Sequence, residues 1–276
     1  MEIGNGRMIN KLIKDMLLIT DMDGTLLDSN GNISKENLNA IEKFRKAGGK
    51  FCVATGRSVL SMASYFETLK FDIPIILYNG SVIYDYNKKE YLHNVFLPET
   101  IYDGIEDVMK DFPDVGVLFV SDECYYIPQS NQSVDDFFAY YKIKSIKCTL
   151  ADVPKQNSKG IFTVPLGMMD EFSKYITQKY GSQVHVTRSS VSLCEIIPLN
   201  TSKGAALLKL CEILNVDVKN TVAIGDYDND IELIKNAGIG ISVKNATDNL
   251  KSVTDIILDY TNDENVLEKV VEYIMK

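Results

Sequence analysis

Two short segments of the chain carry closely spaced aspartates, and each segment follows an unbroken apolar run. Asp21 and Asp23 come directly after Met16–Thr20, and Asp226–Asp230 follows Thr221–Ile224. Apolar runs without polar alternation are typical of central strands in a parallel sheet that is covered on both faces. Ligands bind beyond the carboxyl ends of such strands, so we expect both aspartate segments to face one site. Taken alone, Asp21 and Asp23 are also compatible with a tight turn in which one of them caps the backbone.

Two further segments add groups that suit a phosphate. Thr55 and Gly56 follow the apolar run Phe51–Ala54 and offer a hydroxyl group and a backbone N–H, whereas Lys203 supplies a positive charge at a predicted helix start. Singly, Thr55 is a common helix cap, Lys203 a common solvated lysine, and Asp226–Asp230 a helix start favoured by the helix dipole. Because all of these segments lie in order at strand ends or on a helix beside one, we interpret them as a single phosphate-handling site.

The elements that position these residues alternate between strand and helix at both ends of the chain. Ser34 is a predicted N-cap, with Ile33 and Leu38 as a hydrophobic staple, and Gly48-Gly49 ends that helix. The other predicted elements of this kind are a helix over Ser58–Leu69, a strand over Pro74–Leu77, a helix over Lys203–Leu214, a helix after Asp230, a strand over Gly238–Val243 and a helix over Glu264–Met275. This rhythm predicts a doubly wound α/β domain.

The rhythm changes after Asn79-Gly80. Residues 81–86 and 90–95 predict a hairpin, and they are followed by helices near 99–111 and 133–141 and by strands near 115–120, 161–164 and 184–186. We therefore expect an α/β fold: a doubly wound, Rossmann-like parallel-sheet core with an inserted α+β domain. The expected boundaries are residues 1–84 and 189–276 for the core and residues 85–188 for the insertion.

The four segments together resemble the signature motifs of the haloacid dehalogenase superfamily. They are Asp21–Leu26, Ala54–Gly56, Ser202–Gly204 and Gly225–Asp230. The long insertion between the second and third motifs is similar to that of the Cof-like hydrolase branch, of sugar-phosphatase type, in which a large α+β cap domain stands at this point.

Details outside the motifs are also similar to that branch, and some depart from it. Tyr78–Gly80, Leu199–Lys203 and Asn236–Gly240 follow its pattern. Ser242-Val243 stands where Ala-Met is frequent, and Asn262–Val266 lacks the glycine usual in that tail. The departures bear on substrate contacts and not on the reacting groups.

The resemblance implies a phosphatase that works through a phosphorylated aspartate, and it assigns roles to particular residues. Asp21 would be the nucleophile and Asp23 the acid and base, because a turn at Gly24 would bring Asp23 back towards the leaving oxygen. The implied groups are Asp21, Asp23 and Lys203 for catalysis; Met22, Thr55, Gly56, Lys203 and Asn229 for phosphate; and Asp21, Asp23 (by its carbonyl), Asp226 and Asp230 (through a water) for the metal. For substrate specificity the candidates are Arg57, Asn79, Lys159 and Arg188. Lys159 and Arg188, the two cap cations among them, are also compatible with solvated surface charge.

The density of carboxylates predicts a cation. A carboxylate that attacks a phosphate dianion is repelled by it, and Asp226 and Asp230 would add to the repulsion. Two unit charges roughly 4 Å apart repel by about 4 kcal/mol at an effective dielectric constant near 20. We expect Mg²⁺ together with Lys203, because Mg²⁺ prefers oxygen ligands and retains several waters.

Composition narrows the class of protein and of partner. The chain has 45% hydrophobic and 24% charged residues and a net charge of −9, which is typical of a globular protein and disfavours nucleic acid and anionic membranes as partners. The five cysteines show no metal-ligand spacing, and His93 and His185 stand alone. With no long apolar run and a polar N-terminal stretch, we expect a cytoplasmic monomer or small homo-oligomer that acts on a small phosphorylated metabolite.

Three other functions stay open at this point. A phosphomutase of the same superfamily would return the phosphate to the sugar and release none. A signalling receiver also gathers aspartates, a threonine and a lysine, but it needs no large insertion and no acid at the position of Asp23. A ligand sensor with inactive motifs is the third.

Overall fold

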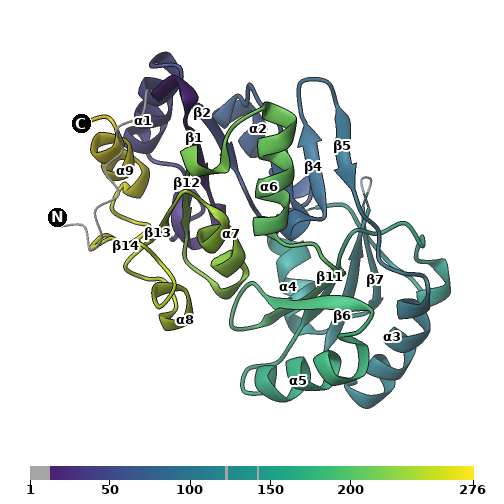
Figure 1. Ribbon diagram of the computed structural model, residues 1–276. Helices are drawn as coiled ribbons and strands as arrows, with labels where there is room; N and C mark the ends of the chain where they lie inside the picture. The colour runs from purple at the N-terminus through teal and green to yellow at the C-terminus, as the bar shows by residue number, and fades with distance from the viewer. Residues whose placement is uncertain (1–12, 122–123, 142) are drawn as a thin grey trace.

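The computed structural model describes residues 13–121, 124–141 and 143–276. Its centre is a five-stranded parallel sheet in the order β14-β13-β12-β1-β2 (Figure 1). The strands are β1 (Leu17–Thr20), β2 (Lys50–Val53), β12 (Thr221–Gly225), β13 (Ile239–Ser242) and β14 (Ile256–Ile257). The chain runs outwards in one direction through β2 and in the other through β13, so β1 and β12 flank the point where strand order reverses. That point is where open α/β sheets bind their ligands.

Helices cover both faces of this sheet, as expected for a doubly wound fold. Helix α1 packs beside α9, and α6 packs beside α7 (Figure 1). The helices of this domain are α1 (Lys35–Lys46), α2 (Ala63–Leu69), α6 (Lys203–Leu214), α7 (Ile231–Asn236), α8 (Asp248–Lys251) and α9 (Val266–Ile274). The predicted N-cap is present, because the Ser34 side chain accepts a hydrogen bond from the Asn37 N–H.

The predicted strand before Tyr78 is present, but it pairs mainly with a hairpin and not with the parallel sheet. β3 (Ile75–Leu77) pairs antiparallel with β4 (Val82–Asp85), which pairs with β5 (Glu90–Asn94). Only one parallel bridge, Ala54 to Ile76, links β3 to the end of β2. In the turn between β3 and β4, Tyr78, Asn79 and Gly80 all have positive φ, and the reversal of the chain there makes β4 run antiparallel to β3.

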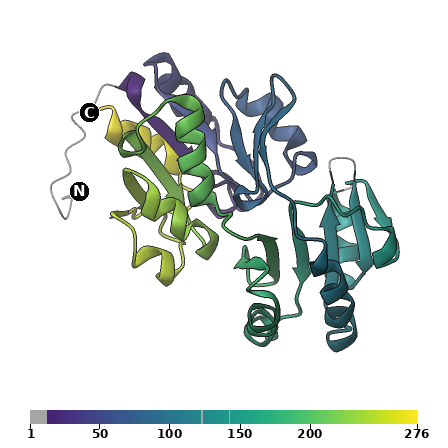
Figure 2. The ribbon, with the colours of Figure 1, turned by 45° about the vertical axis from the view of Figure 1, so that its right-hand side comes forward.

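The inserted domain has its own six-stranded sheet, in the order β10-β11-β9-β6-β7-β8. Its strands are β6 (Gly116–Val120), β7 (Tyr125–Gln129), β8 (Ser145–Lys147), β9 (Gly160–Thr163), β10 (Val184–Arg188) and β11 (Leu193–Pro198). Helices α3 (Thr100–Asp111) and α5 (Met169–Tyr180) pack on one face, and α4 (Gln132–Tyr141) lies on the other. Figure 2 shows this domain, hereafter the cap, beside the core.

Sheet membership differs from the boundaries expected at residues 85 and 188. Hairpin β4–β5 packs on the apolar core of the parallel-sheet domain, whereas β11 belongs to the cap sheet. We therefore propose that the cap begins after β5 and ends with β11. Within the residues that the structure describes, no helix is long and apolar enough to cross a membrane. The five cysteines are all free thiols.

Candidate active site

The loop after β1 places the first aspartate at the reversal point of the sheet. The Asp21 backbone N–H donates to the Ile224 carbonyl at 2.8 Å, which ties this loop to β12. Gly24 then turns the chain with φ +79°, and a β-carbon at this position would collide with the Asp226 carboxylate. Glycine is therefore required twice here, for the turn and for the close approach of the second aspartate segment.

A buried lysine connects the two aspartate segments. The Lys203 Nζ donates to Asp21 Oδ1 at 2.6 Å and to Asp230 Oδ1 at 2.7 Å. The Lys203 ammonium has no exposed surface, and Asp230 has none either. The lysine stands at the first position of α6, whose N-cap Ser202 accepts from the Ala205 N–H, so the helix start fixes where the lysine side chain begins.

The other carboxylate oxygens are also held by hydrogen bonds. Asp230 Oδ2 accepts from the backbone N–H groups of Asp226 and Tyr227 at 3.1 and 3.3 Å. Asp226 Oδ1 accepts from the Thr25 hydroxyl at 3.0 Å. Asp230 is thus oriented by the backbone of its own loop and Asp226 by the loop after β1, so the cluster is preorganised.

The chemistry of this donor set fits a divalent cation. Asp21, Asp226 and Asp230 are buried, and each offers an oxygen within 4.8 Å of the others. Three carboxylates and the Lys203 ammonium leave two negative charges in a buried volume, and two positive charges would neutralise them. Oxygen-only ligation of this kind suits Mg²⁺ better than the softer transition metals.

The pKa shifts reflect the same excess of negative charge. Burial raises the pKa of Asp21 well above its usual value, Lys203 opposes the shift, and Asp230 adds to it. Burial and the nearby Asp230 raise the pKa of Asp226 to about 7, against the influence of Lys203. Burial alone would lower the pKa of Lys203, but Asp21 and Asp230 hold it above its usual value. A divalent metal ion and protons would therefore compete for the carboxylates of Asp21 and Asp226.

The predicted phosphate-binding segments meet beside this cluster. The Thr55 N–H donates to Ile76 at 3.0 Å, and the Thr55 hydroxyl oxygen accepts from the Arg57 N–H at 3.1 Å. The Asn79 N–H donates to the Thr55 carbonyl at 3.0 Å, and the Asn229 side-chain amide donates to Asn79 Oδ1 at 3.1 Å. Residues from three separate loops are thereby joined in one network.

Asp23 lies at the mouth of the site and is paired with Arg57. The Arg57 Nε and Nη2 atoms donate to Asp23 Oδ2 and Oδ1 at 2.8 and 2.6 Å. The Asp23 side chain is 58% exposed, in contrast to the buried aspartates. The Arg57 guanidinium also stacks 4.8 Å from the centre of the Tyr65 ring. Arg57, expected as a specificity residue, thus contacts the expected acid directly.

The two cap cations expected to contribute specificity occupy different surroundings. Lys159 is buried at the start of β9 and forms an ion pair with Glu195. Arg188, at the end of β10, pairs with Asp170 at 2.8 Å and donates to Ser173 on α5. Strand β10 packs against the turn Asp228–Asp230, so Arg188 borders the site whereas Lys159 lies within the junction of cap and core.

Sequence reasoning missed three residues that the structure brings to the site. Thr25 binds Asp226, Glu195 binds Lys159, and the Tyr125 hydroxyl lies 3.1 Å from the Ser58 hydroxyl. Glu195 had a visible signal, because it is the one charged residue in the apolar segment Leu193–Pro198. Tyr125 had none, because its partner lies on the other domain.

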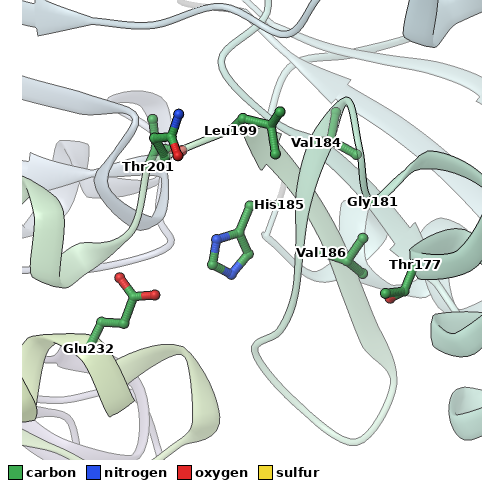
Figure 3. A pocket seen from close by; sticks show the side chains of 9 residues that line it. Thr177, Gly181, Val184, His185, Val186, Leu199, Thr201 and Glu232 are labelled. Atoms are coloured by element: carbon green, nitrogen blue, oxygen red, sulfur yellow. The ribbon is translucent and has the colours of Figure 1, made fainter.

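A pocket of 510 Å³ lies beside the site, at the junction of the two domains. Figure 3 shows His185 of β10 and Thr177 of α5 on its cap side and the Glu232 carboxylate of α7 on its core side. None of the aspartates of the cluster lines it. This pocket is therefore separate from the cluster around Lys203.

Comparisons with known proteins agree with this arrangement. Residues 18–270 match the family of haloacid dehalogenase-like hydrolases. The chain is 24% identical over 269 residues to the 5-amino-6-(5-phospho-D-ribitylamino)uracil phosphatase YitU of Bacillus subtilis (strain 168), covering 94% of this chain and 98% of that protein. It is 23% identical over 270 residues to the pyridoxal phosphate phosphatase YbhA of Escherichia coli (strain K12), with coverage of 94% and 98%.

Among solved structures, a sugar phosphatase of haloacid dehalogenase subclass IIB has the same fold. The TM-score is 0.83 at 18% sequence identity, and the match covers 94% of this chain and 99% of the other. The expected fold class, a parallel-sheet α/β core with an inserted cap, is confirmed. With its four motifs in order and its cap in the expected place, the chain belongs to the haloacid dehalogenase-like hydrolases, as the sequence motifs predicted.

Proposed function

We propose that this chain, a phosphatase of the haloacid dehalogenase-like family, hydrolyses the phosphomonoester of a sugar phosphate or a related small metabolite with Mg²⁺ bound. The observation that carries the proposal is the position of the Lys203 ammonium between Asp21 and Asp230 at the reversal point of the sheet. The Asp21 carboxylate, held there by the buried Lys203 ammonium, is oriented to attack an electrophile that enters from the cap side. The named relatives act on phosphate esters of varied shape, which supports the class of substrate.

In the first step, an Asp21 carboxylate oxygen attacks phosphorus in line with the ester oxygen. The bond from phosphorus to the ester oxygen breaks, and Asp23 gives a proton to the departing alkoxide. Lys203, the Thr55 hydroxyl and the Gly56 N–H bind the phosphoryl oxygens and offset their charge. The Met22 N–H and the Asn229 amide complete this set of donors.

In the second step, water attacks the phosphorus of the phosphorylated Asp21, and Asp23 takes a proton from that water. The acyl phosphate bond breaks, free Asp21 is restored, and inorganic phosphate leaves. Asp21, Asp226, Asp230 and the Asp23 carbonyl would hold the Mg²⁺ ion, which supplies positive charge that offsets the phosphate. Splitting the displacement in two is what a carboxylate nucleophile achieves.

A phosphate-release assay over a panel of phosphorylated sugars, polyols, nucleotides and vitamin cofactors, with and without Mg²⁺, tests the proposal. We expect inorganic phosphate in amounts equal to the free alcohol, and none when the metal is chelated. Conversion of a sugar phosphate to its isomer without phosphate release would instead establish the phosphomutase reaction. The stable accumulation of phosphorylated protein from small phosphodonors would support the receiver.

A further inference from the structure

The cap contains a buried ion pair that none of the steps above employs. Lys159 Nζ donates to Glu195 Oε1 at 2.7 Å, and the two side chains are only 5% and 4% exposed. Lys159 stands directly before β9, and Glu195 lies in the neighbouring strand β11. Buried pairs of this kind contribute little net stability compared with apolar side chains. We therefore infer that this pair serves to position the groups that it contacts.

Both members of the pair contact the core. Lys159 Nζ also donates to the Gly56 carbonyl at 2.5 Å, in the loop that supplies phosphate donors. The second oxygen of Glu195 accepts from the Asn79 side-chain amide. Two cap residues thus bind two loops of the core. Asn79 is in turn hydrogen-bonded to Asn229, whose side-chain amide donates to Asn79 Oδ1.

The bond to the Gly56 carbonyl has a specific consequence for Thr55. The Gly56 carbonyl and the Arg57 N–H belong to the same rigid peptide group, so fixing one fixes the other. The Arg57 N–H donates to the Thr55 hydroxyl oxygen at 3.1 Å. Because that oxygen already accepts a hydrogen bond, the Thr55 hydroxyl hydrogen is left to point at a phosphoryl oxygen.

The bond to Asn79 acts on a second proposed phosphate donor, Asn229. Asn79 has a left-handed backbone conformation, φ +55°, and its amide would crowd a side chain at Gly56. With the Asn79 amide nitrogen donating to Glu195, the Asn79 oxygen faces Asn229 and receives its amide hydrogen. Glu195 therefore selects the orientation of the Asn79 amide, and through it that of Asn229.

We propose that Lys159 and Glu195 are positioning residues for the phosphoryl group: the cap orients the donors of Thr55 and Asn229 through this pair. The inference rests on the proposed function. It assigns Lys159 to the phosphate-binding loop and not to recognition of the leaving group, because two of its three hydrogens are committed to the Gly56 carbonyl and Glu195. The expected effect therefore concerns every substrate, whatever its leaving group.

The test compares Lys159→Met with the double variant Lys159→Met/Glu195→Gln. The single variant leaves a buried carboxylate without its partner and so risks misfolding, whereas the double variant removes both charges together. For each, the turnover of 4-nitrophenyl phosphate and of a sugar phosphate is measured, with inhibition by inorganic phosphate and the Mg²⁺ concentration for half-maximal rate. Lys179→Met is the matched control, since it breaks an exposed cap ion pair with Asp107, and neither residue contacts Lys159 or Glu195.

We expect kcat to fall roughly 10- to 100-fold for both esters in the double variant, because small misplacements of binding groups cost this much. The inhibition constant for inorganic phosphate should rise by a similar factor, while the Mg²⁺ requirement stays unchanged. The Lys179→Met variant should match the parent in all four measurements.

Two results overturn the inference. A higher KM for the sugar phosphate alone, with aryl phosphate turnover and phosphate inhibition unchanged, would assign Lys159 to the leaving group. A lower melting temperature with unchanged kinetic constants would make the pair purely structural.

If the parent releases no phosphate from any ester, the proposed function fails. Calorimetric titration of parent and double variant with inorganic phosphate and Mg²⁺ then still tests the pair, since equal affinities would reject it.

Discussion

Arg57 binds both carboxylate oxygens of Asp23 through two of its nitrogens, at 2.8 and 2.6 Å, so the residue after Gly56 orients the proposed acid. The fork of a guanidinium matches a carboxylate in this way, and a lysine ammonium cannot do so. The Tyr65 ring beneath the guanidinium holds Arg57 in place from the other side. The orientation of Asp23 is therefore set by the residue that follows the second motif and not by its own loop alone.

Replacing Arg57 by Met should release Asp23 and slow the step that needs its proton. We expect kcat for a sugar phosphate to fall about tenfold, with a smaller effect on an aryl phosphate, because loss of orientation penalises proton transfer most. The control is Arg57→Lys, which keeps the charge but cannot bind both oxygens and should be intermediate. Steady-state kinetics with both esters decide this. A change in KM alone would instead indicate that Arg57 contributes to substrate specificity and does not orient Asp23.

Asp23→Asn should slow the first turnover according to the leaving group. A phenolate departs without a proton, whereas a sugar alkoxide needs one, and general acid catalysis contributes roughly 10²–10⁴-fold. Rapid-quench measurement of the first turnover should show most of that loss with the sugar phosphate. The aryl substrate should instead give a burst, because hydrolysis of phosphorylated Asp21 loses its base. Equal slowing for both esters would mean that another group supplies the proton.

Asp21→Asn should abolish phosphate release while the protein stays folded. The amide oxygen can still accept from Lys203, but an amide does not attack phosphorus. Circular dichroism establishes the fold, and a radiolabelled substrate tests for a covalent phosphoprotein, which should be absent. Asp103→Asn, on the exposed face of α3, is the matched control and should behave as the parent. Turnover at the parental rate in folded Asp21→Asn would exclude the nucleophile assigned here.

Asp226→Asn should weaken metal binding first and chemistry second. Removing one buried carboxylate deletes an attraction of a few kcal/mol, so the Mg²⁺ concentration for half-maximal rate should rise on the order of tenfold or more. Part of the activity should return at high Mg²⁺. Overlapping titration curves for variant and parent would show that Asp226 is not a ligand.

The metal-free protein should lose stability as the pH rises towards neutrality. The pKa of Asp226 is about 7 in the folded state against an ordinary 3.8, so between these values the folded state holds a proton that the unfolded state has lost. The free energy of unfolding therefore falls with rising pH, by about 4 kcal/mol at most for this group.

Melting temperatures in a chelator between pH 5 and 8 measure this effect. The slope should be shallower in Asp226→Asn, and added Mg²⁺ should raise the melting temperature most at the upper end of the range. A metal-free melting temperature that rises from pH 5 to pH 8 would contradict the expected direction.

The strands and helices that carry the motifs could be predicted because their signals are local. Leu17–Thr20 and Thr221–Gly225 contain no charged residue and are buried at every position, and Ser34 marks a helix start by its type. In the cap, β8 (Ser145–Lys147) is exposed at every position, so no apolar pattern marks it. Helix α5 had the signal in Met169, Phe172 and Ile176, but the sequence analysis did not identify it.

In the site, likewise, the residues placed by strand order could be predicted, whereas the ion pairs between distant residues could not. Strand order places Asp21 and Asp226 together, because parallel strands end at one edge of the sheet, and Lys203 joins them from the start of α6. The pairs Arg57–Asp23 and Lys159–Glu195 could not be predicted, because no sequence pattern indicates which distant side chains will form an ion pair. A long side chain reaches several neighbours, and only the packed structure shows which one it meets.

The position of the cap in the chain has a consequence for how new substrate ranges arise. All of the groups proposed to act on phosphorus lie before β3 or after β11, so insertions and exchanges within the cap leave these residues in place. Lys159 and Glu195 lie within the cap, and the orientation proposed for Thr55 and Asn229 depends on them. A chimaera that receives a foreign cap would recover full turnover only if the donor brings its own lysine and glutamate at these two places, however well its surface fits the new substrate.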